Sequence, residues 1–83
     1  MTHEEILRRT TAVVAEILGI EDLRLAAATT AANVDGWDSI ANVEIMVGLE
    51  KEFGIRFRTG EMTGAANVGE LVERIAKRLP GRV

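Results

Sequence analysis

Apolar residues recur along the start of this chain with the period of an α-helix. Over residues 3–18 they return every three or four positions, which is typical of a helix with one buried face. Thr2 and Glu5 have the spacing of a helix capping box, and Gly19 is placed to end the helix. The pattern therefore predicts a first helix over about residues 3–18.

A second helix is predicted to begin at Ser39 and end near Phe53. Asp38 is a good N-cap because its carboxylate can accept a hydrogen bond from an early backbone N–H, and Gly54 is a helix-ending residue. At about 100° per residue, the apolar side chains span roughly 220° of this helix. That arc is wider than the apolar stripe of about 100° that a surface helix needs. One side of the arc is expected to face the core (Ile45, Met46, Leu49 and Phe53).

The other side of this helix leaves an aliphatic strip that consists of Ile40, Val43 and Val47. Glu44 and Glu50 border it. Such a strip fits a docking surface for a partner with an apolar groove and a Lys/Arg rim. It fits equally well a face covered by the long connection over residues 20–37. Helix geometry alone leaves both readings open.

The rest of the chain predicts two further elements. A single helical turn is expected over residues 59–64, where two glycines interrupt the pattern. A narrow apolar stripe after Asn67 predicts a last helix, ended by Pro80 and Gly81. The expected fold is an all-α four-helix bundle, with a long first loop and a short third helix. Residues 1–83 are expected to form a single domain.

Composition removes several classes of function. The chain has no cysteine, so disulfides, thiol catalysis and thiolate zinc sites are excluded. Its one histidine, His3, lies in the N-terminal tail and is expected to be solvated. The start of the chain does not resemble a secretory signal, and no apolar run approaches the roughly 20 residues of a membrane span. A soluble, cytoplasmic protein that works without a membrane is expected.

Charge is distributed unevenly along the chain. Residues 35–52 hold five acidic residues and one basic residue, a net charge of −4, whereas the whole chain carries −3 and the remainder therefore +1. An acidic segment in an otherwise neutral chain argues against nucleic acid and for a basic protein partner. A solvated helix face explains the same charge count.

Ser39 is the only serine, and the sequence gives it no means of catalysis. A serine nucleophile needs a neighbouring base, and "GWDSI" lacks the G-x-S-x-G pattern. A calcium loop is excluded too, because placing Gly36 sixth puts Ala31 first and Asn42 twelfth, where acids are required. We expect no catalytic residue and no metal site.

Two readings of Ser39 remain. It is either an ordinary residue of the first helical turn or an attachment point that another enzyme modifies. The N–H groups and dipole of a helix start favour an attached phosphate. An Asp cap, a serine, an aliphatic strip and flanking acids occur together here, which favours the second reading.

The segment "DGWDSIANVEIMVGLEKEFGI" resembles the acyl carrier protein family, whose signature is a D-S-[LI] triplet that opens an acidic second helix. The resemblance covers nearly the whole chain and implies the four-helix fold of acyl carriers. It also implies that Ser39, next to Asp38, bears a covalent 4′-phosphopantetheine that a phosphopantetheinyl transferase adds from coenzyme A. The terminal thiol of this arm would carry an acyl group as a thioester.

The same resemblance assigns partner-binding residues. Asp38, Glu44 and Glu50 match acids that contact the basic docking surfaces of acyl-activating or acyl-transferring enzymes. The apolar docking positions fall on the aliphatic strip, Ile40, Val43 and Val47, and on Phe57 after the helix. The implied protein is a monomeric carrier of an acyl, aminoacyl or polyketide group in a biosynthetic pathway. A non-catalytic helical module that docks through the same face is the alternative.

This sequence departs from primary fatty-acid carriers at several positions. Ala41 replaces an acid two residues after the serine, Lys51 replaces a second acid, and Arg56 and Arg58 stand where acids are common. Trp37 is more typical of polyketide, peptidyl and other specialised carriers. The resemblance therefore implies a stand-alone carrier for a dedicated pathway.

Overall fold

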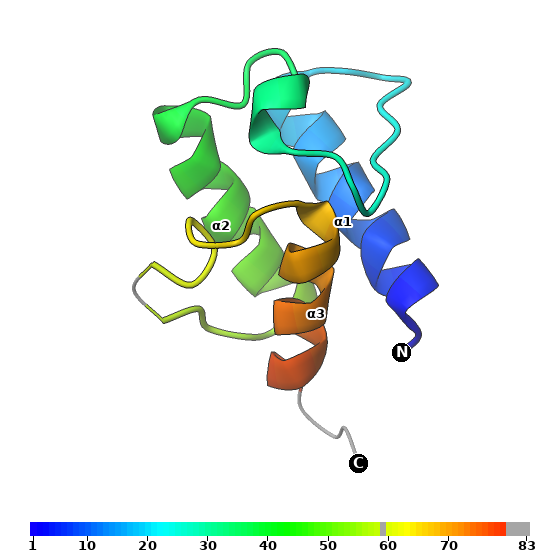
Figure 1. The fold of residues 1–83 in the computed structure, drawn as a ribbon, viewed down its shortest axis with the longest axis vertical. Helices are drawn as coiled ribbons and strands as arrows, with labels where there is room; N and C mark the ends of the chain where they lie inside the picture. The colour runs from blue at the N-terminus through cyan, green and yellow to red at the C-terminus, as the bar shows by residue number, and fades with distance from the viewer. Residues whose placement is uncertain (59, 80–83) are drawn as a thin grey trace.

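The structure, a computed structural model, describes residues 1–58 and 60–79, and this part of the chain is folded as helices and loops without strands. It contains α1 (His3–Leu18), a short 3₁₀ helix η1 (Ala31–Asn33), α2 (Ser39–Phe53) and α3 (Val68–Arg78), as Figure 1 shows. The expected all-α fold is confirmed. Among the described helices, none is long and apolar enough to cross a membrane.

Local capping explains why the helices begin and end where they do. Thr2 Oγ1 accepts a hydrogen bond from the Glu5 backbone N–H at 3.1 Å at the start of α1. Asn67 Oδ1 accepts one from the Glu70 backbone N–H at 2.9 Å at the start of α3. α1 stops at Gly19, whose φ of 70° is a conformation that other residues rarely adopt. These bounds agree with the sequence prediction.

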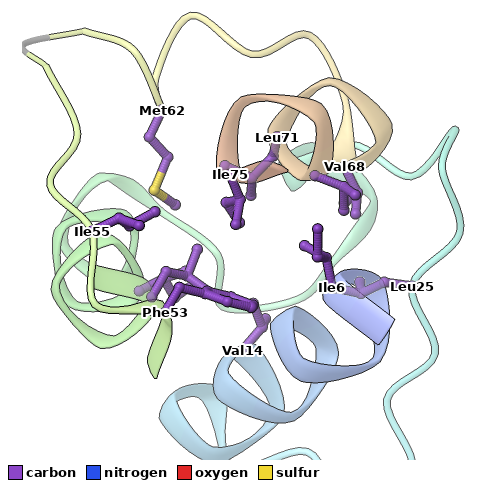
Figure 2. Packing of buried hydrophobic residues seen from close by; sticks show 12 residues of the cluster. Ile6, Val14, Leu25, Phe53, Ile55, Met62, Val68, Leu71 and Ile75 are labelled. Carbon is purple, nitrogen blue, oxygen red and sulfur yellow. The ribbon is translucent and has the colours of Figure 1, made fainter. Parts of the chain in front are cut away.

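The core lies where α1 packs against both α2 and α3. The expected inner side of α2 is confirmed, since Ile45, Leu49 and Phe53 are buried and Met46 packs against them. Figure 2 shows their neighbours from the other elements converging on the same space. These neighbours are Ile6 and Val14 of α1, Leu25 of the first loop, Ile55 and Met62 after α2, and Val68, Leu71 and Ile75 of α3.

Gly48 allows α1 and α2 to approach closely. A Cβ atom at this position would lie 2.9 Å from Val13 Cγ1 and 3.2 Å from Ile17 Cδ1, both on α1. Only a residue without a side chain fits this crossing without a shift of its neighbours. The close packing holds α2 against the core along one side and leaves its other side outward.

The expected helical turn over residues 59–64 forms turns instead of a helix in its described part, residues 60–64. The Gly64 N–H donates to the Gly60 carbonyl at 2.8 Å, but Gly60 has a φ of 77°, which interrupts a right-handed helix. Met62 from this segment is buried in the core. Thr59, and the expected helix end at Pro80 and Gly81, lie outside the described residues.

Candidate functional site

Ser39 lies in the first turn of α2, at the exposed end of the helix. Asp38 caps this helix, since its Oδ1 accepts the Ala41 backbone N–H at 2.8 Å and its carbonyl accepts the Asn42 N–H at 2.8 Å. Ser39 itself is exposed, and its hydroxyl has no hydrogen bond to another described residue. The cap therefore fixes the backbone while the serine hydroxyl stays accessible to solvent.

A hydrogen bond between two side chains spans the same turn. The indole N–H of Trp37 donates to Asn42 Oδ1 at 2.9 Å, and both residues are half-buried. Asn42 was not among the residues for which the sequence predicted a structural role. The available signal was its angular position on the core side of α2, between Leu49 and Phe53, where a polar side chain needs a hydrogen-bond partner.

A cavity of about 350 Å³ lies beside Ser39. On the α2 side it is lined by Asn42 and Val43, and across from them by Met62 and by Leu71 of α3. Most of its lining is apolar. The serine hydroxyl therefore lies at the border of a hollow that could accommodate part of an attached group.

Glu61 fixes the loop that contains Met62, one of the residues that line this cavity. The Glu61 carboxylate accepts the Arg58 backbone N–H at 2.9 Å and forms an ion pair with Arg78 of α3 at 3.1 Å. Arg74 of α3 also donates to the Glu61 carbonyl. The Arg58 hydrogen bond, assisted by Arg78 and opposed by desolvation, lowers the pKa of Glu61 below its usual value. The contacts of Glu61 with Arg74 and Arg78 were not predicted because these arginines are distant from it in the chain.

The aliphatic strip of α2 is open to solvent. Ile40, Val43 and Val47 are 76%, 56% and 40% exposed, respectively. The connection over residues 20–37 does not cover them, so that reading of the strip is wrong. Exposed aliphatic side chains grouped on one helix face often mark a binding surface.

The charged and aromatic residues that were expected beside this strip divide into two groups. Glu44 is exposed and has no ion pair with another described residue. Glu50 instead accepts the Phe57 backbone N–H at 2.9 Å, and Phe57 is half-buried against the core. The structure therefore brings Glu44 to the strip but ties Glu50 and Phe57 to each other.

Comparison with known proteins gives one family match and relatives of two kinds. The family model described as "Phosphopantetheine attachment site" matches residues 8–75. An acyl carrier protein of Cyanidium caldarium is 34% identical over 79 residues, which cover 95% of this chain and 92% of that protein. The non-reducing polyketide synthase ausA of Penicillium brasilianum is 36% identical over 76 residues, 92% of this chain, but the match spans only 3% of the synthase.

A solved structure has a similar fold. The solution structure of a holo acyl carrier protein from Geobacter metallireducens superposes with a TM-score of 0.80 at 29% sequence identity. The match covers 88% of this chain and 84% of that one. The likeness therefore includes most of the helices and loops around Ser39.

Proposed function

This chain belongs to the acyl carrier protein family and bears a covalent 4′-phosphopantetheine, and we propose that Ser39 is the residue to which this group is attached. One observation carries the assignment: an exposed serine hydroxyl, without a protein hydrogen-bond partner among the described residues, directly follows the cap of α2. No other serine occurs in the chain.

The residues around Ser39 fit a phosphodiester-linked arm. The N-terminal N–H groups and dipole of α2 favour a negative phosphate at this end of the helix. The adjacent cavity offers a mainly apolar surface next to the attachment point. When bound, the group supplies a terminal thiol that holds an acyl group as a thioester. A chain without cysteine has no such thiol of its own.

Proteins of this family work with a phosphopantetheinyl transferase and with acyl-handling enzymes. The function that we propose is to hold an acyl, aminoacyl or polyketide group and to present it to partner enzymes of a dedicated biosynthetic pathway. Docking would use the aliphatic strip (Ile40, Val43 and Val47) together with Glu44. The likeness to a polyketide synthase supports a specialised pathway.

Incubation with coenzyme A, Mg²⁺ and a phosphopantetheinyl transferase of broad specificity tests the attachment residue. Intact-mass spectrometry is expected to show the addition of one phosphopantetheine to the wild-type protein and none to Ser39→Ala. Circular dichroism of both proteins controls for folding, and an unrelated carrier controls for transferase activity. Modification of a folded Ser39→Ala protein would show that the group is attached to a residue other than Ser39.

The same masses distinguish the alternatives. A folded protein that an active transferase leaves unmodified would favour a non-carrier interaction module that docks through α2. A phosphate-only mass on material purified from cells would indicate ordinary phosphorylation of Ser39. Either result would overturn the proposed attachment.

A further inference from the structure

The exposed face of α2 changes its charge from one end to the other. At about 100° per residue, Ile40, Glu44, Val47 and Lys51 lie within roughly 60° of arc, and Val43 lies about 40° beyond one edge of that arc. All five are exposed. Glu44 and Lys51 are separated by about 10 Å along the helix axis. We call these five residues the docking face, and it carries an acid toward Ser39 and a base toward Gly54.

Additional acids extend the negative end. Asp35 and Asp38 are both exposed in the turn that leads to Ser39. Asp38 uses one carboxylate oxygen to cap α2 and leaves the other without a hydrogen bond to a described residue. Neither Asp35 nor Glu44 forms an ion pair within the described part of the chain. This end of the docking face therefore presents uncompensated negative charge beside the serine.

Additional bases extend the positive end. Lys51, Arg56 and Arg58 are exposed, and none of them forms an ion pair with another described residue. The bond from the Phe57 N–H to Glu50 holds residues 56–58 alongside the last turns of α2. The two arginines therefore flank the end of the docking face.

The acids at this end are already engaged within the chain. Glu50 accepts the Phe57 N–H, and Glu52 pairs with Arg9 of α1 at 3.4 Å. Compensation of the helix dipole explains a lysine in the last turn of α2. It does not explain Arg56 and Arg58, which lie beyond the helix. Glu50 keeps its negative charge because the Phe57 N–H is neutral, but three bases exceed this one acid, so a net positive charge remains at this end.

We infer that the docking face fits a protein partner whose apolar groove is basic near Ser39 and acidic at the opposite end. This inference rests on the proposed function and adds the kind of partner. A uniformly basic surface would attract Asp38 and Glu44 but repel Lys51, Arg56 and Arg58. A groove with both charges matches each end, and it fixes the direction in which α2 lies on the partner.

Three helix-stapled peptides with the same leucine stripe serve as defined probes. The first carries lysines in one half and glutamates in the other, the second interleaves the same residues, and the third carries lysines only. Binding to ¹⁵N-labelled protein is measured by NMR titration at low and high salt. The segregated peptide is expected to bind about fivefold more tightly than the other two at low salt, with shifts centred on α2.

Charge reversal at the basic end provides the matched variant. K51E/R56E/R58E is expected to lose the preference for the segregated peptide and to bind the all-lysine peptide best. R8E/R24E/K77E changes the net charge equally at exposed residues away from this face and is expected to keep the wild-type preference. If the first variant does not fold, K51E alone is expected to shift the preference in the same direction.

Each other outcome contradicts the inference. A wild-type preference for the all-lysine peptide would indicate a uniformly basic partner, and equal binding of all three peptides would indicate no charge recognition. Shifts on α2 that depend on protein concentration alone would assign the face to a second copy of this chain. Loading of the same samples by the transferase is measured separately. A protein that is loaded but shows no peptide preference would contradict the inferred kind of partner without contradicting the proposed function.

Discussion

The indole N–H of Trp37 donates a hydrogen bond to Asn42 Oδ1 at 2.9 Å, across the first turn of α2. Ser39 lies between these residues in the sequence and lines the same cavity. The half-buried pair therefore joins the loop before α2 to the helix itself. Its contribution to the order of the site can be measured because Trp37 is the only tryptophan in the chain.

Asn42→Ala removes the acceptor of this bond and leaves the indole N–H of Trp37 without a protein partner. We expect the free energy of unfolding to fall by about 1 kcal/mol and the tryptophan emission to change as the ring gains mobility. Urea unfolding followed by fluorescence measures both effects. Glu44→Ala, at an exposed position of the same helix, is the control. An Asn42→Ala protein with the stability and emission of the wild type would contradict the prediction.

Glu44 and Glu50 are expected to respond differently to substitution. Glu50→Ala removes the acceptor for the Phe57 N–H and is expected to reduce the free energy of unfolding by about 1 kcal/mol. Glu44→Ala should stay within about 0.5 kcal/mol of the wild type. Chemical denaturation of both variants compares them directly.

Substitution of Glu44 is expected to affect loading by the transferase more than substitution of Glu50, the reverse of their effects on stability. Glu44→Lys is expected to lower kcat/KM of a phosphopantetheinyl transferase more than Glu50→Lys does, because Glu44 is exposed on the docking face and Glu50 is tied to the chain. Loading rates with both variants folded provide the measurement. Equal losses of rate would argue that Glu50 also contacts the transferase.

Thr10 of α1 is fully buried, and its hydroxyl has no hydrogen-bond partner among the described residues. Thr10→Val replaces this hydroxyl with a methyl group of similar shape, so we expect stabilisation by about 1 kcal/mol. The neighbouring Thr11→Val is a matched control, since the Thr11 hydroxyl donates to the Leu7 carbonyl at 2.8 Å. Thermal unfolding should show a higher Tm for Thr10→Val than for Thr11→Val. The reverse order would indicate that Thr10 is satisfied in solution.

The helix bounds could be predicted from the sequence because the signals that set them are local. Thr2, Asp38 and Asn67 each accept a hydrogen bond from a backbone N–H three residues further on. Such contacts depend on few neighbours. Helical periodicity likewise indicated which residues lie on each side of α2, but it left open whether the outer side is exposed or covered.

Contacts between distant segments were not predictable from local patterns. Glu50 was expected on the docking surface, but the return of the chain at Phe57 engages it. A helical turn was expected around residues 59–64, but the described part of this segment forms turns. Its conformation depends on α3, because Met62 is buried in the core and two arginines of α3 bind Glu61. Tertiary packing decides such segments more than propensity does.

Glu61 is expected to make the stability of the protein depend on pH in the acid range. The Arg58 N–H and the Arg78 guanidinium lower its folded-state pKa below the ordinary value of 4.5. The unfolded chain therefore binds this proton more readily than the folded protein does. The stabilisation from Glu61 is thus fully present above pH 4.5 and is lost as the pH falls through the folded-state pKa.

Glu61→Gln tests this dependence because the amide does not titrate. The difference in unfolding free energy between the wild type and Glu61→Gln is expected to shrink as the pH falls from about 7 to about 3, since the wild type alone loses the ionised carboxylate. Urea unfolding across this range gives the difference at each pH. Glu73→Gln on the exposed face of α3 controls for the change in net charge. A difference for Glu61→Gln that is constant with pH would contradict the prediction, because it would show that ionisation of Glu61 adds no stability to the folded protein.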